Sequence, residues 1–257
     1  MKILIKLGGT LLESEETRRD LCEQIAAAQA AGHQTVVVHG GGKRLSRYLE
    51  DQGVESEFRN GLRVTAPEIM DAVLRIFAGS VNHRLVAELG RAGAKAIGLS
   101  GIDAGIVQAV QLSPELGAVG KISKVNPAPL DLLTSEGYVP TVACVAGGAD
   151  GEIFNVNGDQ MAAACAGGVR ADQMIYLTDV AGVLDGNQAL IPSLTIQGAL
   201  DLIELGVAQG GMEAKLRAAI SSIEQGTKHV RVAAGAEPNV IGRLLAGEAI
   251  GTDMVAG

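Results

Sequence analysis

The 257-residue sequence contains no tryptophan, and aromatic residues make up only 2% of it. Basic residues are also few: 21 lysines and arginines stand against 29 aspartates and glutamates, which gives a formal net charge of -8. Proteins that bind nucleic acids need basic surfaces and often aromatic rings on which bases stack. The composition therefore argues against a nucleic-acid partner, and an anionic ligand would need a locally positive site on this acidic protein.

Long apolar runs are also missing, whereas a membrane-spanning helix takes about 20 apolar residues. No secretory or transit segment precedes the first strand pattern, so we expect a cytoplasmic protein with no membrane partner. The few cysteines and histidines are widely spaced; they are Cys22, Cys144, Cys165, His33, His39, His83 and His229. The thiols are predicted to be buried and reduced, and the histidines to have surface or packing roles without forming a metal site.

Two glycine-rich turns each follow a short aliphatic run. Residues 6–9 read Lys-Leu-Gly-Gly, and residues 39–42 read His-Gly-Gly-Gly. Glycine allows sharp turns and close approach of backbone N–H groups to a ligand, and a following helix adds a positive dipole end, so both turns are predicted to hold an anion. The alternative is that these glycines only permit tight strand-to-helix connections. Neither turn matches a dinucleotide-binding or Walker-type fingerprint, since Leu45 replaces the third glycine that the former requires.

Aliphatic runs alternate with amphipathic stretches along the chain. Strands are predicted over 2–7, 35–39, 95–99, 106–111, 117–125, 138–145, 173–178 and 229–233. Helices are predicted over 14–31, 43–52, 67–92, 128–136, 158–167, 195–205, 212–225 and 239–246. This order predicts an α/β fold, a three-layer sandwich in which helices cover both faces of a mainly parallel central sheet. No linker divides the chain, and the softest boundary predicts two fused lobes, 1–170 and 171–257.

A hairpin is predicted to interrupt this regular alternation between the second and third helices. Residues 57–65 read Glu-Phe-Arg-Asn-Gly-Leu-Arg-Val-Thr, and Asn60-Gly61 is the strongest short hairpin signal in the chain. Irregular segments of this kind often carry binding groups. The hairpin is therefore a candidate part of a ligand site.

Three later segments combine glycine with polar or charged side chains. Residues 155–160 read Asn-Val-Asn-Gly-Asp-Gln before a helix pattern, which indicates either ordinary helix capping or a ligand site at the end of a strand. Residues 177–186 form a short polar loop punctuated by glycine. Residues 210–215 place a glycine pair at a helix start with Lys215 one turn later, which is either a solvated lysine or part of a second anion site.

Taken together and in order, these motifs resemble the amino acid kinase family, and within it the members that phosphorylate N-acetyl-L-glutamate in arginine biosynthesis. The match covers essentially the whole chain, from residues 6–9 to Gly211-Met212 and Lys215. The resemblance implies the fold of that family, the lobe 1–170 for the acyl substrate and dimerisation, and the lobe 171–257 for the nucleotide. It also implies ATP, with Mg²⁺ bound through the nucleotide, and transfer of the γ-phosphoryl group to the side-chain carboxylate. That carboxylate is ionised at neutral pH, with a reference pKa of about 4.3, so no general base is required.

The resemblance also implies roles for individual residues. The catalytic set would be Lys6, Lys215, Asp159, Gly8 and Gly9, with the lysines approaching the transferred phosphoryl group, Asp159 holding both of them, and Gly8, Gly9 and Gly41 donating backbone N–H groups. The acyl substrate would be bound by Gly41, Gly42, Arg63 and Asn155, with Arg63 pairing with its α-carboxylate. The nucleotide would be bound by Asp179, Val180, Ala181, Gly182, Val183, Leu184, Val207, Ala208, Gln209, Gly211 and Met212.

Two alternative functions stay open. One is a kinase acting on N-acetylaminoadipate, or a carrier-protein-linked relative, in lysine biosynthesis; acetylaminoadipate is longer by one methylene, which a pocket discriminates by only about 1–3 kcal/mol. The other is a nucleotide-binding regulatory protein without catalysis. The chain begins at its first strand, without the extra helix of arginine-sensitive relatives, so the resemblance implies a homodimer without arginine feedback. Helix 67–92 is the expected dimer surface, although its apolar face would equally suit the core.

Overall fold

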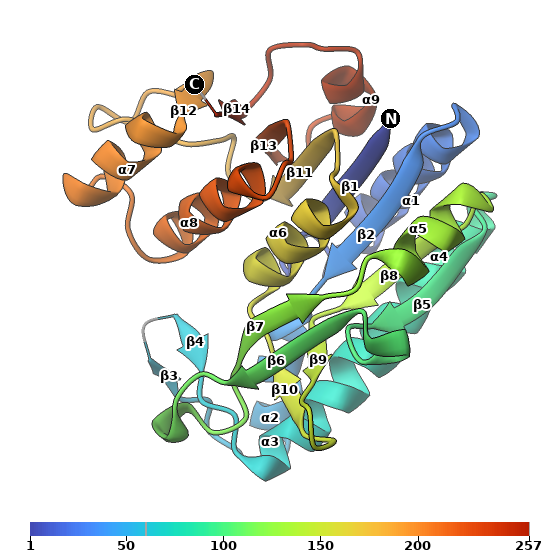
Figure 1. Cartoon of the computed structure of the whole chain (residues 1–257), viewed down its shortest axis with the longest axis vertical. Helices are drawn as coiled ribbons and strands as arrows, with labels where there is room; N and C mark the ends of the chain where they lie inside the picture. Colours follow the sequence, from blue (N-terminus) through green and yellow to red (C-terminus); the bar gives the residue numbers. More distant parts are fainter. Residues whose placement is uncertain (60, 257) are drawn as a thin grey trace.

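The computed structural model describes residues 1–59 and 61–256. Its largest element is an eight-stranded sheet with the order β12-β14-β13-β11-β1-β2-β8-β5 (Figure 1). The strands are β1 (Lys2–Leu7), β2 (Gln34–His39), β5 (Ala96–Ser100), β8 (Val139–Ala143), β11 (Gln173–Thr178), β12 (Ser193–Thr195), β13 (His229–Ala234) and β14 (Thr252–Val255). Every neighbouring pair is parallel except β13 and β14. The predicted mainly parallel sheet is confirmed.

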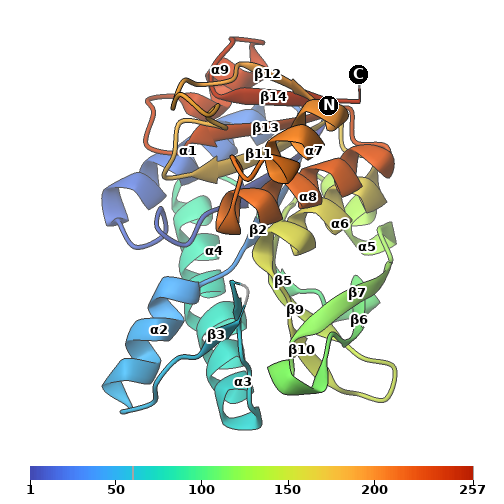
Figure 2. The same cartoon turned by 90° about the vertical axis from the view of Figure 1, so that its left-hand side faces the viewer.

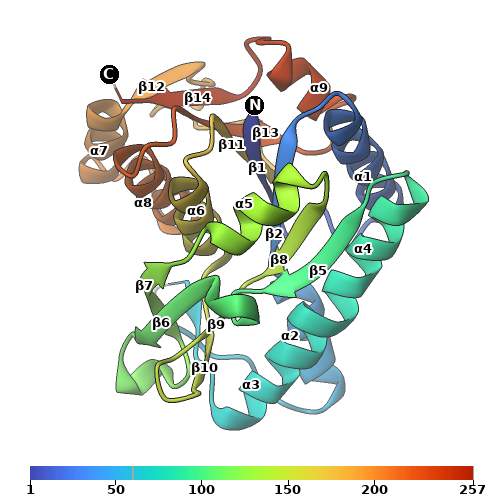
Figure 3. The ribbon, with the colours of Figure 1, turned by 45° about the vertical axis from the view of Figure 1, so that its right-hand side comes forward.

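Helices cover both faces of this sheet (Figures 1 and 3). One face carries α5 (Ala128–Ser135), α6 (Gly158–Val169) and α8 (Gly210–Glu224), with α7 (Ile196–Glu204) beside α8. The other face carries α1 (Glu15–Ala30), α4 (Asn82–Arg91) and α9 (Val240–Leu245). Because central strands are covered on both faces, β1 and β2 are continuous aliphatic runs rather than alternating ones. The three-layer arrangement is as the sequence predicts.

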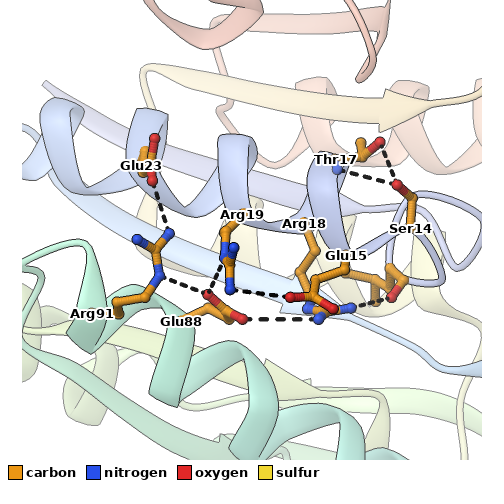
Figure 4. A network of polar contacts seen from close by, with 9 residues as sticks. Ser14, Glu15, Thr17, Arg18, Arg19, Glu23, Glu88 and Arg91 are labelled. Carbon is orange, nitrogen blue, oxygen red and sulfur yellow. Dashed lines mark hydrogen bonds and ion pairs between the residues drawn. The ribbon is translucent and has the colours of Figure 1, made fainter.

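The solvent-facing sides of α1 and α4 are joined by a network of ion pairs (Figure 4). Glu88 lies at its centre, 3.0 Å from Arg91, 3.8 Å from Arg19 and 3.9 Å from Arg18. The start of α1 is fixed separately, because the Ser14 side chain accepts a hydrogen bond from the Thr17 amide at 3.2 Å. Arg19 and Arg91 are 50% and 44% exposed, and ion pairs at this level of exposure contribute only about 0.2–1 kcal/mol each.

The predicted helix 67–92 is one helical run with an unusual middle. It consists of α3 (Pro67–Val73), the π-helical segment η1 (Leu74–Val81) and α4, and the residues at both junctions keep right-handed helical angles. Its apolar side, including Phe77 and Val81, is buried. π-Helical turns are rare and occur often at functional sites. Here the π-helical segment packs beneath the second glycine turn, where a Cβ on Gly41 would lie 2.8 Å from the Phe77 ring.

Smaller elements lie beyond the carboxyl ends of the central strands (Figure 2). On one side are α2 (Gly42–Asp51) and the hairpin of β3 (Phe58–Arg59) and β4 (Leu62–Arg63). On the other side is a four-stranded sheet with the order β10-β9-β6-β7, formed by β6 (Val107–Gln111), β7 (Gly120–Val125), β9 (Val145–Gly147) and β10 (Ile153–Asn155), with the 3₁₀ turns η2 (Asp103–Gly105) and η3 (Pro114–Leu116) nearby. The two strands of the predicted hairpin are confirmed, while Asn60 at its turn lies outside the described residues.

Several predicted boundaries were wrong. The strand predicted over 138–145 is two strands, β8 and β9, which separate at Cys144 as the chain leaves the main sheet for the small one. The strand predicted over 117–125 begins only at Gly120, because Gly117 has a φ of 66° after a 3₁₀ turn. The short strands β10, β12 and β14 were not predicted. All three cysteines are free and buried, as expected, and no helix among residues 1–59 and 61–256 is long and apolar enough to span a membrane.

Candidate active site

The candidate site lies at the carboxyl ends of the central strands. In the parallel register, Leu7 of β1 is paired with His39 of β2 and with Leu177 of β11, and His39 is paired with Ala143 of β8. The chain segments that leave these strands therefore begin at one edge of the sheet, which is where open α/β sheets bind ligands. This register brings together both glycine turns, Cys144 and the loop after β11.

Two lysines from distant parts of the chain meet on one carboxylate. Lys6 Nζ lies 2.7 Å from Asp159 Oδ1, and Lys215 Nζ lies 2.8 Å from Oδ2, to which it donates a hydrogen bond. Lys6 comes from β1, Asp159 from the first turn of α6, and Lys215 from α8, which packs against α6. The side chains of both lysines are only 13% exposed. The structure thus brings together the three charged residues of the predicted catalytic set.

The charge state of Asp159 follows from competing effects. Burial raises the pKa of its carboxyl group, but the charges of Lys6 and Lys215 and their hydrogen bonding outweigh burial and lower the pKa below its ordinary value of 3.8. Asp159 also lies at the amino end of α6, where the helix dipole favours a negative charge. The carboxylate is therefore ionised at neutral pH, and two cations share one anion.

Two neighbouring side chains hold this cluster in place. Asn157 caps α6 by accepting hydrogen bonds from the amides of Asp159 at 2.9 Å and Gln160 at 3.2 Å. The buried Tyr176 hydroxyl donates to the backbone carbonyl of Asp159 at 3.0 Å, and the Lys215 ammonium lies 5.7 Å from the Tyr176 ring centre. Burial raises the pKa of Tyr176 well above its ordinary value, so it stays a donor. Ordinary capping and ion pairing thus occur together at residues 157–159.

The glycine turns differ in what their amides can do. In this structure the Gly8 N–H, which was predicted to face a ligand, donates to the Leu177 carbonyl at 3.0 Å and continues the ladder between β1 and β11. Its lack of a side chain matters because a Cβ would lie 3.0 Å from that same oxygen. The amides of Gly9 and Gly41 have no acceptor in the described part of the chain, and Gly42 begins α2, where N–H groups have no partner within the helix.

A cavity of about 300 Å³ lies between the hairpin and the two glycine turns at residues 6–9 and 39–42. Its lining includes the predicted site residues Lys6, Gly9, Gly41, Gly42, Arg63 and Asn155. Asn155 is held from β10 by donating to Thr65 Oγ1 at 3.1 Å, and Thr65 in turn donates to the Arg63 carbonyl at 2.9 Å. Apolar walls come from Phe77, Val119 and Val156. All four residues predicted to bind the acyl substrate therefore share one cavity with Lys6.

Arg63 is a buried cation with neutral neighbours. Its guanidinium donates to the Ser56 hydroxyl, to Ser46 Oγ at 2.6 Å and to the Gly42 carbonyl at 3.2 Å, and it stacks on Phe58 with 4.6 Å to the ring centre. Arg63 is only 7% exposed, and burial lowers its pKa. No carboxylate of the described residues pairs with it. A buried guanidinium without a counterion is well suited to bind a carboxylate ligand in bidentate fashion.

A second, larger cavity of about 1090 Å³ lies on the other side of Asp159. It runs between β7 and the helices α6 and α8, and Gly210 and Gly211 at the start of α8 open into it. Gly61, Leu62 and Asn157 line both cavities, so the two spaces adjoin at the hairpin and at the start of α6. Lys6 lines the smaller cavity and Asp159 the larger one, which places the ion-pair cluster at their boundary.

The other segments predicted to bind the nucleotide lie in the second lobe. The loop 179–184 follows β11, and Val207, Ala208 and Gln209 precede α8. Just after the loop, a Cβ on Gly186 would lie 3.9 Å from Val207. Val183 and Ala208 are buried and bonded to protein atoms, whereas Val180 and Val207 are exposed. Asp179 connects this loop to the first glycine turn, 3.5 Å from Thr10 Oγ1.

Comparison with known proteins decides the family. The sequence model of a protein family, described as the amino acid kinase family, matches residues 1–234 of the chain. The chain belongs to the amino acid kinase family. An acetylglutamate kinase of Solibacter usitatus is 59% identical over 255 residues, 99% of each chain. An acetylglutamate kinase of Koribacter versatilis is 39% identical over 259 residues, 100% of this chain and 99% of the relative.

Solved structures agree with the family assignment. A Streptococcus mutans protein superposes with a TM-score of 0.85 at 28% identity, covering 100% of this chain and 99% of the other. The N-acetylglutamate synthase of Neisseria gonorrhoeae, complexed with coenzyme A and N-acetyl-glutamate, gives a TM-score of 0.88 at 25% identity; this chain spans 59% of that longer chain. The predicted amino acid kinase fold is confirmed.

Some site residues of this amino acid kinase were not predicted from the sequence. Ser46 and Ser56 hold Arg63, and Tyr176 supports Asp159, but nothing in their local sequence marks them. Lys43 lines the smaller cavity directly after the second glycine turn. Its position next to three glycines was a signal that could have been used, because a lysine at the start of a glycine-capped helix suits an anion site.

Proposed function

We propose that the chain transfers the γ-phosphoryl group of MgATP to the side-chain carboxylate of N-acetyl-L-glutamate, giving N-acetyl-L-glutamyl 5-phosphate. The observation that carries the proposal is the pair of lysines on Asp159, located at the boundary of a cavity that holds an uncompensated arginine. The 59% identity to a relative named acetylglutamate kinase supports the choice of substrate. This places the chain in amino-acid biosynthesis.

The acyl substrate would occupy the smaller cavity. Arg63 would bind the α-carboxylate and replace its contacts with the two serine hydroxyls by a bidentate pair of hydrogen bonds to an anion, which matches the geometry of the guanidinium. Asn155, Gly41 and Gly42 would offer an amide side chain and free backbone N–H groups to the remaining polar atoms. The side-chain carboxylate would then point toward Lys6, which lines the same cavity.

Phosphoryl transfer would depend on positioning and positive charge. The attacking carboxylate is already ionised, with a reference pKa of about 4.3, so no residue has to remove a proton. Negative charge on the transferred group would be stabilised by Lys6, by Lys215 and by the free amide of Gly9. Asp159 would not touch the phosphoryl group but would fix the positions of both ammonium groups.

MgATP would approach from the second lobe. The loop 179–184 with Val207, Ala208 and Gln209 would receive adenine and ribose, while Gly211 and Met212 at the start of α8 would face the phosphates. In the described part of the chain, no group of three or more histidine, cysteine or acidic side chains is placed to hold a metal ion. We therefore expect Mg²⁺ to be carried in by the phosphates of the nucleotide. This division assigns the acyl substrate to residues 1–170 and the nucleotide to residues 171–257.

We also propose a homodimer. The helical run 67–92 was the expected contact surface, but its apolar residues, such as Val73 and Leu85, are fully buried in the protomer. A dimer formed there would therefore use the half-buried and polar side of the run. Sedimentation equilibrium would measure the mass, and a monomer at micromolar concentration would contradict the proposal.

The reaction is tested by trapping an acyl phosphate as its hydroxamate. The chain is incubated with MgATP, hydroxylamine and, in turn, N-acetyl-L-glutamate, N-acetylaminoadipate, aspartate or carbamate. We expect the highest kcat/KM with N-acetyl-L-glutamate. A higher kcat/KM with N-acetylaminoadipate would show that the chain is a kinase of the lysine-biosynthesis type instead. ATP binding without product from any acceptor would indicate a regulatory protein. Lys6→Ala should lower the rate of product formation by about 100-fold or more, whereas Lys2→Ala, on the same strand but paired with Asp131 at 2.6 Å, should leave it unchanged.

A further inference from the structure

A buried polar chain lies beneath the second glycine turn and is not used by the proposed reaction. His39, the last residue of β2, is fully buried. Its Nδ1 lies 2.8 Å from the Gly40 carbonyl oxygen, and its Nε2 lies 2.9 Å from Asn82 Nδ2. Asn82 comes from α4, where the π-helical segment ends, and a Cβ on Gly98 of β5 would collide with its side-chain oxygen. The imidazole is thus held between the Gly40 carbonyl and Asn82, and the Asn82 side chain is itself packed against β5.

The hydrogen bonds determine which ring nitrogen of His39 carries the proton. Asn82 Nδ2 also faces the carbonyl oxygens of Thr141 at 2.7 Å and Leu99 at 3.2 Å, which identifies it as the amide nitrogen and hence a donor. Because the Gly40 carbonyl oxygen can only accept, Nδ1 of His39 must carry the hydrogen donated to it, and in the neutral ring Nε2 is then the acceptor that faces Asn82. Burial lowers the pKa of His39 to about 4, so the ring is neutral at pH 7 and keeps this tautomer.

The bond to Gly40 fixes the direction of the next amide. No peptide bond in the described residues is cis, and in a trans peptide the C=O and N–H groups point in opposite directions. His39 draws the Gly40 carbonyl into the core, so the Gly41 N–H points outward, toward the cavity that Gly41 lines. On its other side Gly41 is closely packed against Phe77. Glycine alone would allow this peptide to rotate, and His39 removes that freedom.

We infer that His39, held by Asn82, is a positioning residue that orients the Gly40–Gly41 peptide so that the Gly41 amide can bind the acyl substrate. The expected effect on binding of the acyl substrate rests on the proposed function. The expected effect on the orientation of the Gly40–Gly41 peptide does not depend on the reaction. Neither His39 nor Asn82 touches the substrate; each acts through the peptide. The pair therefore matters more for binding and alignment of the acyl substrate than for binding of ATP.

The test compares three replacements of His39. His39→Asn keeps a side-chain N–H at the position of Nδ1 and can still bind the Gly40 carbonyl, whereas His39→Gln reaches Asn82 instead, and His39→Leu reaches neither. His83→Leu is the matched control. The exposed His83 also contacts a backbone carbonyl, that of Gly79 at 2.9 Å, but this carbonyl does not belong to the glycine turn. Each variant is assayed for kcat, for the KM of both substrates and for thermal unfolding, and crystal structures report the Gly40–Gly41 peptide.

We expect His39→Leu and His39→Gln to lower kcat/KM for the acyl substrate by about 10- to 100-fold with the KM for ATP changed less than about twofold, and His39→Asn to recover most of the loss. The peptide should be rotated in His39→Leu and His39→Gln and retained in His39→Asn. A retained peptide in His39→Gln, or equal losses in His39→Asn and His39→Gln, would overturn the inference, and this comparison stands even where His39→Leu does not fold. Absence of acetylglutamate phosphorylation by the unsubstituted protein would instead refute the proposed function, and the peptide orientation would still decide the role of His39.

Discussion

The sharpest test of the site is the replacement Asp159→Asn, which keeps the shape of the side chain and removes its charge. In the native protein one carboxylate lies 2.7 and 2.8 Å from two ammonium groups that are each only 13% exposed. Removing the shared anion leaves two adjacent cations without a counterion. Breaking a buried ion pair by removing one partner costs about 3–5 kcal/mol. Because the lysines keep some contact with solvent, we expect the lower end of that range for the free energy of unfolding.

The catalytic effect of Asp159→Asn should differ from its effect on ATP binding. Both lysines keep their charges, so the affinity for the anionic nucleotide should stay equal or increase. Their positions are no longer fixed, and loss of preorganised charge at a transferring group typically lowers kcat by about 100- to 1000-fold. The assay is hydroxamate formation for kcat, with isothermal titration calorimetry for ATP. Unchanged kcat, or equal losses in kcat and ATP affinity, would refute the reasoning.

A matched control and the pH dependence sharpen this prediction. Asp172→Asn also removes a carboxylate from an ion pair, with Lys228 at 2.6 Å, but at the opposite end of β11, and kcat should be unaffected. The lowered pKa of Asp159 means that its contribution to stability is present above 3.8, its unfolded value, and is lost as the pH falls below 3.8 through the folded pKa. The difference in unfolding free energy between Asp159→Asn and the native protein should therefore shrink below pH 3.8. A constant difference down to pH 2 would contradict the ion-pair account.

Three further predictions follow from the geometry. Lys6→Ala and Lys215→Ala should each lower kcat by about 100-fold or more with little change in ATP affinity, because their charges act on the transition state; equal losses in the two quantities would contradict that role. Arg63→Ala should raise the KM for the acyl substrate by roughly 10- to 100-fold and leave that for ATP nearly unchanged, as measured by steady-state kinetics; a defect specific to ATP would place the hairpin at the wrong site. Gly8→Ala should lower the free energy of unfolding, measured with denaturant, by about 1–3 kcal/mol, since its Cβ would press on the Leu177 carbonyl. In Gly42→Ala the new Cβ meets nothing within 4 Å, so the free energy of unfolding should change little. A larger loss in Gly42→Ala than in Gly8→Ala would contradict the described packing of the two turns.

The architecture and the charged core of the site could be predicted because their signals are local and repeated. The runs at 2–7 and 173–178 are mostly apolar and do not alternate with polar residues, which is typical of strands buried on both faces of a parallel sheet. Parallel strands end at a common edge, so the motifs that follow them had to lie near one another. Lys6 and Lys215 are more than two hundred positions apart, and only the order of the motifs, through the family resemblance, connected them before the structure did.

The parts that were missed depend on contacts that no local pattern encodes. Asn82 lies in a helix whose apolar spacing gave no reason to single out one amide, and its partner His39 looked like an ordinary residue at a strand end. Gly8 was expected to bind a ligand through its amide, but strand pairing with β11 uses that amide first. The short strands β10 and β12 have only three residues each, too few for an alternating pattern to be recognised.

The cluster of Lys6, Asp159 and Lys215 holds its two ammonium groups in the arrangement that the proposed reaction needs. Two ammonium groups held together without an anion would repel each other, and the protein would move them apart or unfold locally. A second carboxylate would neutralise them fully and leave nothing for the phosphoryl group. One carboxylate between two lysines leaves one unit of positive charge, so the cluster is stable without substrate and still favours an incoming phosphate. Stability of the resting site and stabilisation of the transferred group are therefore set by the same side chain, and a substitution at Asp159 should change both.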